Sequence, residues 1–378
     1  MISFQVVARS GQARAGLLST DHGVVATPAF MPVGTQAAVK GVSPDEVAAS
    51  GARMLISNTY HLWLRPGPEV IAAHGGLHGF MRWPHAVATD SGGYQAFSLA
   101  DLRRVSDDGF DFRSHLDGSR HHLSPEEAMR VQGLLGSDVA LQLDVCPPAG
   151  APPGELAEAI RRTTAWASRC LESRRPGQAL FGIVQGGVDP ELRRRHAAEL
   201  AALPLDGLAL GGFSVGEAPP VMHRVLREIV PEVDSARPRY LMGVGTPLDL
   251  IVAIGAGVDL FDCVMPTRNA RNGQVFVGND RVVIRNARWK DSREPLDPSC
   301  GCPACAGGFS RAALRHLFLA GEILAHRLLT LHNLWYYQRL VREAREAVEE
   351  GRYDAWAAAA AAALVLRGAA KSQEIPED

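Results

Sequence analysis

Three aspartates occupy positions from which a carboxylate could act on a ligand. Asp90 precedes a Gly-Gly turn in TDSGGYQ, Asp144 ends the apolar segment VALQLD, and Asp262 lies within FDCVMP. A carboxylate so placed either faces a ligand or is buried at a high free-energy cost. For a single aspartate, accepting hydrogen bonds from loop backbone is an equally good explanation. Three of them together favour a nucleophile, a general acid/base and a group that recognises the substrate.

A cluster of cysteines indicates a metal centre. Cys300, Cys302 and Cys305 form a C-x-C-x2-C motif, whereas the other three cysteines are scattered along the chain. Soft thiolates in a compact loop are typical of structural zinc, which takes four ligands in a closed tetrahedron. The spacing favours metal binding over a disulfide framework and therefore predicts a reducing cytoplasm. The sequence does not choose the fourth ligand among three histidines of the following helical segment, which are His316, His326 and His332.

Two glycine-rich segments could donate hydrogen bonds to a substrate oxygen. They are Gln185-Gly186-Gly187 and Gly211-Gly212. Backbone and amide N–H groups of this kind can form an oxyanion site, although turn glycines explain either segment alone equally well. No phosphate-binding loop or dinucleotide-binding motif occurs at a predicted junction between a strand and a helix, so we expect no nucleotide cofactor.

The elements that position these residues are short apolar segments separated mostly by helical patterns. Near-continuous apolar segments are typical of strands that are buried on both faces. Strands that alternate with helices predict parallel βαβ units, and eight of them predict a (β/α)8 barrel. The expected strands are residues 28–34, 54–58, 86–90, 139–144, 180–185, 207–212, 240–245 and 260–266.

The alternative fold is an open doubly wound sheet, which would gather its polar residues at one switch point. Here many strands end in a polar or small residue, as barrel active sites require. We therefore predict the barrel. These strand ends are Asn58, Asp90, Asp144, Gln185, Gly211-Gly212, Gly243 and Asp262.

The pattern changes after the eighth strand, so we expect three parts. Residues 1–271 would form the barrel, 272–335 a zinc-binding insert that begins with a hairpin, and 336–378 helices that complete the barrel.

Composition describes an ordinary soluble globular protein. The 378 residues are 46% hydrophobic and 21% charged, with a net charge of −2, so any surface for a phosphate-bearing partner must be local. Nearly all basic residues are arginine, which suits phosphates and guanine edges. The N-terminus does not resemble a secretory signal, and no segment approaches the roughly 20 apolar residues of a membrane span. We expect a cytoplasmic protein that does not bind membranes.

Seven strings in collinear order resemble the tRNA-guanine transglycosylase family over nearly the whole chain, in its bacterial form. Each string alone is weak, but the ordered set is highly specific. The strings are DSGGYQ (90–95), FGIVQGG (181–187), LALGGFSVGE (208–217), YLMGVG (240–245), FDCVMPTRNARNG (261–273), C-x-C-x2-C (300–305) and TLHNLWYYQRL (330–340).

The resemblance implies an enzyme that exchanges the wobble guanine of tRNAs with GUN anticodons, through a covalent bond between an aspartate and ribose. Asp262 would be the nucleophile and Asp90 the general acid/base, an assignment that the sequence alone does not fix. The incoming base would be 7-aminomethyl-7-deazaguanine (preQ1), for queuosine biosynthesis. The resemblance also implies one structural zinc ion per subunit, with His332 as the fourth ligand, and a homodimer.

The other roles that the resemblance implies concern the base and the RNA. Asp144 would bind the amino-pyrimidine edge of the base, and Gln185 and the Gly212 amide would meet its carbonyl oxygen. Tyr94 and Met242 would enclose the ring. Arg268 and Arg271 would read the next nucleotide. Cys146 and Val215 would select the aminomethyl base over queuine, and Phe213 would be a further residue that contacts the base.

The chain departs from the family pattern at three places. Val145 stands where a glutamate is expected, Phe213 replaces a leucine in a position to crowd the aminomethyl group, and CAGGF (305–309) is one residue longer than expected.

Three alternative functions remain. A non-catalytic partner subunit of this family would keep the fold and the zinc, but Asp90 and Asp262 with their flanking residues argue against it. A carbohydrate-active barrel would use paired carboxylates but has no role for the zinc unit or the two arginines. A zinc-dependent hydrolase needs an open metal site, whereas three close cysteines predict a closed one.

Overall fold

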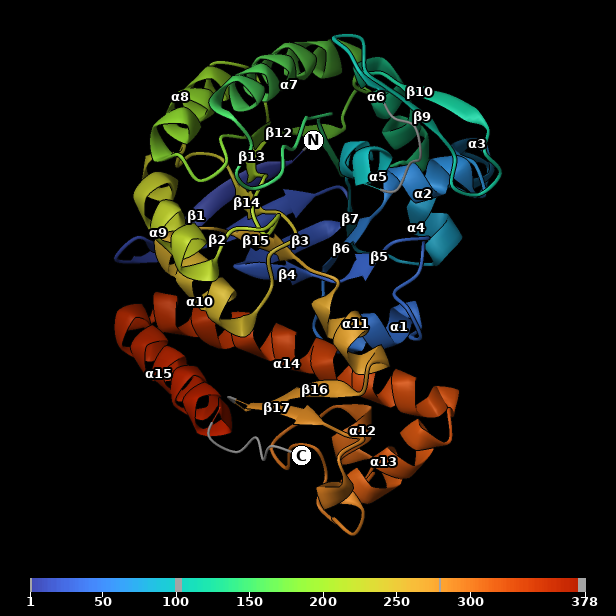
Figure 1. Cartoon of the computed structure of the whole chain (residues 1–378), viewed down its shortest axis with the longest axis vertical. Helices are drawn as coiled ribbons and strands as arrows, with labels where there is room; N and C mark the ends of the chain where they lie inside the picture. Colours follow the sequence, from blue (N-terminus) through green and yellow to red (C-terminus); the bar gives the residue numbers. More distant parts are fainter. Residues whose placement is uncertain (1, 99–103, 279, 373–378) are drawn as a thin grey trace.

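The molecule consists of a parallel β-barrel and a smaller unit at the other end of its long axis (Figure 1). The computed structural model describes residues 2–98, 104–278 and 280–372. The helix α14 (Ile323–Glu349) crosses the molecule between the two parts. Within the described residues, no helix is both long and apolar enough to cross a membrane.

The barrel is closed, which confirms the predicted (β/α)8 fold and excludes the open sheet. Its first strand is divided at Pro32 into β4 and β5, of which β4 pairs with β15 and β5 pairs with β6. Proline has no N–H to donate, so it interrupts the ladder here. The barrel strands are β4 (Ala29–Met31), β5 (Val33–Gly34), β6 (Met54–Ser57), β7 (Ala86–Thr89), β11 (Val139–Leu141), β12 (Ala179–Val184), β13 (Gly207–Leu210), β14 (Arg239–Leu241) and β15 (Leu260–Asp262).

Burial explains the composition of these strands. Every residue of β6, β7, β11, β12, β13 and β14 is buried. One side of each strand faces the barrel interior and the other faces the surrounding helices, so both must be apolar.

The helices begin as the sequence predicts. Ser43 and Ser124 are N-caps, and their hydroxyls accept from the amides of Glu46 and Glu127. The helices before the smaller unit are α1 (Pro44–Ala49), α2 (Thr59–Leu64), α3 (Pro68–Ala73), α4 (Gly76–Met81), α5 (Gly93–Ser98), α6 (Pro125–Leu135), α7 (Pro153–Ser173), α8 (Pro190–Ala201), α9 (Pro219–Ile229), α10 (Pro247–Ala256) and α11 (Met265–Arg271).

Two antiparallel sheets were not expected from the sequence. One sheet contains β8 (Arg104–Val105), β9 (Phe110–Arg113) and β10 (Arg120–Leu123). The other contains β1 (Ser3–Ser10), β2 (Ala13–Thr20) and β3 (Gly23–Thr27), and its Leu18 and Val25 pack with the apolar residues inside the barrel. Its Arg14 forms a buried ion pair with Asp259, immediately before β15, so this sheet covers the N-terminal end of the barrel.

The smaller unit begins with the expected hairpin, formed by β16 (Gln274–Val277) and β17 (Asp280–Val283). It continues through α12 (Pro303–Ala306) and α13 (Arg311–Leu319) into α14, which α15 (Tyr353–Ser372) follows. The boundary that we expected between residues 335 and 336 lies inside α14. This helix also bonds to the barrel, because Tyr337 donates to the carbonyl of Gly245 and Gln338 to that of Phe30.

Candidate active site and metal centre

A cavity of about 220 Å³ lies at the C-terminal ends of the barrel strands. Asp90, Asp144 and Asp262 reach it from three different strand ends, with the glycines that follow β13 beside them. Its lining residues are Ile56, Asp90, Ser91, Tyr94, Gln95, Asp144, Cys146, Gly211, Gly212, Phe213, Ser214, Val215, Tyr240, Met242, Gly243 and Asp262.

Asp262 is held through only one of its two carboxylate oxygens. The hydroxyl of Tyr240 donates to Oδ1 at 2.6 Å, and the amide of Gly243 donates to the same atom at 2.7 Å. Among the described residues, none donates to Oδ2. Burial raises the pKa of Asp262, and the two donors oppose this rise. The arrangement fixes the carboxylate and leaves one oxygen free to react.

Asp90 is held through both oxygens. The amides of Thr59 and Gly92 donate to Oδ1 at 2.9 and 3.1 Å. The side chains of Asn58 and Gln95 donate to Oδ2 at 2.5 and 3.3 Å. Burial raises the pKa of Asp90 to about 7 against these hydrogen bonds, and the charge of Asp262 adds to the rise. A group with this pKa exchanges protons near neutral pH.

Asp144 lies on another side of the cavity, where Gln185 holds it. The amide Nε2 of Gln185 donates to Oδ2 of Asp144 at 2.6 Å. Burial raises the pKa of Asp144 to about 6. Gln185 is buried and is not among the lining residues, and its Oε1 has no hydrogen-bond partner among the described residues. Gly212, whose φ is 66°, packs against that oxygen where a Cβ would clash with it.

The loop after β13 presents backbone to the cavity. The amides of Ser214 and Val215 both donate to the carboxylate of Glu217, which is not among the lining residues. In a trans peptide the N–H and the preceding C=O point in opposite directions. The carbonyl of Phe213 is therefore directed away from Glu217, and Phe213 is itself a lining residue of the cavity.

The ring of Phe213 lies against the guanidinium of Arg193, whose carbon is 3.7 Å from the ring centroid, and only 4% of Phe213 is exposed. Arg193 is fully buried and donates to the carbonyls of Gly187, at 2.6 Å, and Gly211, at 2.9 Å. Burial lowers the pKa of Arg193 to about 9. This side chain joins the two glycine-rich segments behind the cavity.

The remaining residues with a predicted role at the base also line the cavity. Tyr94 is half-exposed on α5, and Met242 follows β14. Cys146 and Val215 lie on the side where Asp144 is placed. Burial raises the pKa of the Cys146 thiol to about 12, so it is neutral at physiological pH.

Arg268 and Arg271 belong to α11, which begins three residues after Asp262. Arg268 is exposed, whereas Arg271 is half-buried and its NH1 has no hydrogen-bond partner among the described residues. Burial lowers the pKa of Arg271, and the charge of Arg268 adds to this effect. A buried guanidinium nitrogen without an acceptor costs free energy, and an acceptor supplied by a ligand would remove this cost.

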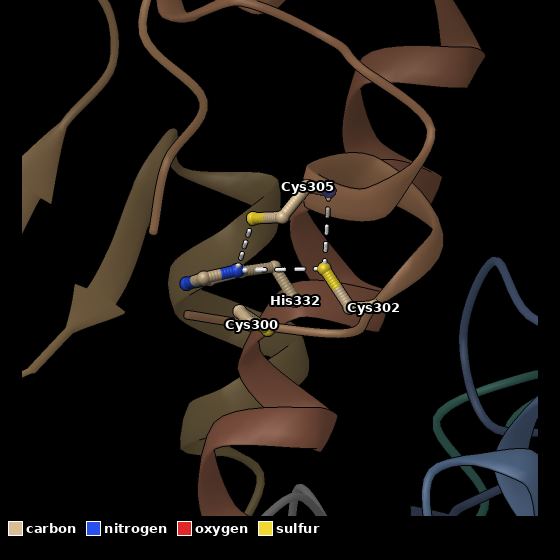
Figure 2. Close-up of side chains that lie close together, drawn as sticks. All are labelled: Cys300, Cys302, Cys305 and His332. Carbon is tan, nitrogen blue, oxygen red and sulfur yellow. Dashed lines mark hydrogen bonds between the residues drawn. The ribbon is translucent and has the colours of Figure 1, made fainter. Parts of the chain in front are cut away.

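A second group of residues forms a closed cluster in the smaller unit. Cys300, Cys302, Cys305 and His332 are buried and could hold a metal ion. Figure 2 shows the histidine nitrogen facing the sulfur atoms of Cys302 and Cys305, at 3.6 and 3.4 Å. The other two candidate histidines, His316 and His326, are not in this cluster.

The surroundings of His332 suit a metal ligand. Its Nε2 donates to the carbonyl of Phe276 at 2.7 Å, and its Nδ1 is directed at the thiols of Cys302 and Cys305. The side chain of the next residue, Asn333, accepts a hydrogen bond from the amide of Phe276 and donates one to the carbonyl of Pro266. The same part of α14 therefore supports the metal cluster, the hairpin and α11.

Sequence reasoning did not assign roles to several residues that hold the site. These are Tyr240 beside Asp262, Thr59 and Gln95 beside Asp90, Arg193 and Glu217. For Tyr240, the signal was a tyrosine in the otherwise apolar expected strand 240–245. For Arg193, on the amphipathic helix α8, no signal separated it from its neighbours Arg194 and Arg195.

Comparison with known proteins gives the family. Residues 9–364 match the family model described as "Queuine tRNA-ribosyltransferase". A protein of that name from Sorangium cellulosum is 66% identical over 94% of this chain and 91% of its own length. Relatives with the same name from Moorella thermoacetica and Cereibacter sphaeroides are 52% and 50% identical, over 93% and 94% of this chain and 94% and 95% of theirs. The chain belongs to the queuine tRNA-ribosyltransferase family.

Proposed function

We propose that this protein is a tRNA-guanine transglycosylase of queuosine biosynthesis, which replaces the guanine at the wobble position of tRNAs with GUN anticodons. The observation that carries this proposal is the pairing of two differently held carboxylates at one cavity. Asp262 has a free oxygen, whereas Asp90 is saturated with donors and has a pKa of about 7. Family membership supports the same reaction.

In the first displacement, Oδ2 of Asp262 attacks C1′ of the wobble nucleotide. A C–O bond forms, the C1′–N9 bond breaks, and its electron pair leaves with the guanine. Asp90 supplies the proton that the departing base needs. The donors Tyr240 and Gly243 hold the attacking carboxylate in one orientation, which lowers the entropic cost of the step. Asp90 is the weaker candidate for the nucleophile because four donors occupy its oxygens.

In the second displacement, a new base enters the cavity and gives its N9 proton to Asp90. Its N9 attacks C1′, the bond to Asp262 breaks, and the carboxylate is restored. The glycosidic bond is exchanged rather than hydrolysed, so no external energy source is needed. Covalent catalysis divides one difficult displacement into two easier ones.

The cavity favours preQ1 as the incoming base. The carboxylate of Asp144 suits the N–H groups of the amino-pyrimidine edge, and Gln185 positions that carboxylate. Tyr94 and Met242 enclose the ring. The carbonyl of Phe213 is an acceptor for the ammonium of the aminomethyl group. Cys146 and Val215 limit the space for the larger queuine.

The RNA contact involves α11. Arg268 and Arg271 lie on the helix that begins three residues after the proposed nucleophile, and the unpartnered NH1 of Arg271 has N–H groups to donate to a base edge or a phosphate oxygen. We therefore propose that both arginines bind the nucleotide after the wobble position. We also propose that the protein works in the cytoplasm, together with its tRNA substrate.

The Cys3His cluster would hold one structural zinc ion. Three thiolates and one imidazole are a donor set typical of closed zinc sites, and the bond from His332 to Phe276 provides the usual support for the ligand. The ion would stabilise the unit and would leave no position for a catalytic water. We propose three functional parts: the barrel (1–271), the zinc-binding insert (272–335) and the helices that complete the barrel (336–378). The helix α14 joins the last two parts.

The expected homodimer has a candidate contact at the turn between α13 and α14. Leu319, Ile323 and Leu324 expose 56%, 80% and 43% of their surfaces there. We propose that a second copy covers these apolar side chains. Light scattering should show a dimer for the native chain and a monomer for Ile323→Asp.

The test is incorporation of radiolabelled guanine into unmodified tRNA that carries a wobble guanosine. The native enzyme should label the RNA. Asp262→Asn should neither label it nor form a covalent complex with RNA that survives denaturing electrophoresis. Asp291→Asn, at a highly exposed aspartate, is the matched control and should behave as the native enzyme.

Other outcomes would reject parts of this proposal. A native enzyme that binds tRNA without incorporating label would instead be the non-catalytic subunit of the family. A covalent complex that persists in Asp262→Asn but disappears in Asp90→Asn would reverse the two catalytic roles. If the enzyme incorporated queuine into tRNA as efficiently as preQ1, the proposed base selectivity would be refuted.

A further inference from the structure

A second group of metal-ligating side chains lies outside the site already described. His22 is in the turn between β2 and β3, His78 is on α4, and Asp138 immediately precedes β11. Nδ1 of His22 is 2.8 Å from Oδ1 of Asp138, and Nε2 of His78 is 3.2 Å from Oδ2. One ligand atom from each residue lies within 4.8 Å of the others, as is also true of the Cys3His cluster.

This group lies at the opposite end of the barrel from the base cavity. Val87, near the start of β7, exchanges two hydrogen bonds with Asp138, through its amide to Oδ2 and through its carbonyl to the amide of Asp138. Asp90 follows the other end of the same strand. The group is therefore separated from the catalytic residues by the length of the barrel, and base exchange assigns it no role.

The burial of the three residues favours a bound ion. The carboxylate of Asp138 is only 3% exposed, whereas the side chains of His78 and His22 are 12% and 38% exposed. A buried carboxylate with two imidazoles is a donor set that binds Zn²⁺ and similar divalent transition metals. A cavity lined by His22, Asp138 and Asp21 leads to the group from solvent, so water or a second carboxylate has access to it.

The two imidazoles would have to move slightly to share an ion. Their rings are stacked, with centroids 3.5 Å apart and planes at 12°. Lone pairs in nearly parallel planes do not meet at one point, so one ring must tilt. His22 has room to do so because it is part of an exposed turn. Each imidazole would then bind the ion through the nitrogen that now faces Asp138, as the neutral tautomer with its proton on the other ring nitrogen.

We propose that His22, His78 and Asp138 bind one divalent transition-metal ion, of which Zn²⁺ suits the ligands best. The ion connects three separate elements: the N-terminal sheet through His22, α4 through His78, and the start of β11 through Asp138. It fastens the sheet that covers the N-terminal end of the barrel. This role is stabilising and does not depend on the reaction at the other end.

The experiment uses the full-length protein with its Cys3His cluster already loaded with zinc. Titration with Zn²⁺, followed by gel filtration and elemental analysis, should raise the metal content from one ion per chain to two. Titration with Co²⁺ should give visible d–d bands without the near-ultraviolet bands of cobalt bound to thiolate. The second ion should also raise the melting temperature.

His22→Gln is the decisive variant, because glutamine keeps an N–H donor for Asp138 but is a poor metal ligand. Its affinity for the second ion should fall by at least about 10-fold, and its melting temperature should not respond to zinc. His74→Gln, at an exposed histidine of the α3 C-terminus whose imidazole bonds to the carbonyl of Val70, should bind two ions. A native chain that retains only one ion, or a His22→Gln variant that binds the second as tightly as the native chain, would overturn the proposal.

Discussion

The hydroxyl of Tyr240 donates to Oδ1 of Asp262 at 2.6 Å, and the two residues lie on neighbouring strands of the barrel. Burial and the nearby carboxylate hold the pKa of Tyr240 well above its ordinary value, so the phenol keeps its proton and remains a donor. The bond occupies the oxygen that does not react and stabilises the charged form of Asp262. Tyr240 is therefore a positioning residue for the proposed nucleophile.

Removing this donor should slow formation of the covalent complex. A hydrogen bond to a charged group is worth roughly 1.5–3 kcal/mol, so Tyr240→Phe should lower the single-turnover rate by about 10- to 100-fold. The KM for tRNA should change little, because the phenol does not contact the RNA in the proposed complex. Quenched-flow measurement of the complex tests this, and an unchanged rate would show that the Gly243 amide alone suffices.

The pH dependence should report the pKa of Asp90. The first displacement uses its protonated form, so the rate of guanine release should fall as the pH rises through about 7. In Asp90→Asn the rate should be much lower and this limb of the profile should be absent. Single-turnover rates between pH 5 and pH 9 would check the prediction. A limb that persists in Asp90→Asn would belong to another group.

The raised pKa of Asp90 also affects the free energy of unfolding. The pKa of Asp90 is about 7 in the folded chain, against an ordinary value of 3.8. The folded chain therefore binds this proton more tightly than the unfolded chain, and the stabilisation is complete below about pH 4 and is lost as the pH rises through about 7. Asp90→Asn should remove this component of the pH dependence in urea titrations. If the free energy of unfolding depended on pH equally in the native chain and in the variant, this prediction would be wrong.

Loss of the Cys3His cluster should affect folding before chemistry. Losing a structural metal belongs to the few changes that cost more than about 4 kcal/mol, so His332→Ala or chelation of zinc should unfold the smaller unit. Binding of tRNA should weaken with it, because Asn333 in the same helix supports α11 and its two arginines. Circular dichroism and tRNA binding would be measured together. If only the chemistry were lost, with fold and binding intact, the structural assignment of the metal would be wrong.

Arg193 and Phe213 should control binding of the base. Replacing Arg193 by methionine leaves the carbonyls of Gly187 and Gly211 without their donor, at a cost of roughly 1–3 kcal/mol each. We expect a KM for the free base raised by about 10-fold or more, with tRNA affinity unchanged. Phe213→Leu keeps an apolar side chain and removes the contact with the guanidinium, worth about 0.5–2 kcal/mol, and should have a smaller effect. If the KM for the base and the affinity for tRNA changed by the same factor, the substitution would have caused a general loss of stability.

The sequence alone determined the barrel and the approximate positions of its chemistry. Eight apolar segments separated by helices leave few other arrangements, and the carboxyl ends of parallel strands meet at one face. For this reason Asp90, Asp144 and Asp262, which are far apart in the chain, could be expected at one cavity. Local spacing likewise marked Cys300, Cys302 and Cys305 as metal ligands.

The tertiary structure decided what depends on contacts between distant segments. The sequence left three histidines as candidates for the fourth metal ligand, and only the packing of α14 against the hairpin turns His332 toward the cysteines. The direction of the Phe213 ring depends on Arg193, twenty residues earlier, and the free oxygen of Asp262 depends on the phenol of Tyr240. The stacked pair His22 and His78 unites a turn and a helix that no local pattern connects. A side chain's partner is fixed by which elements pack together, and that information is absent from the spacing of residues along one element.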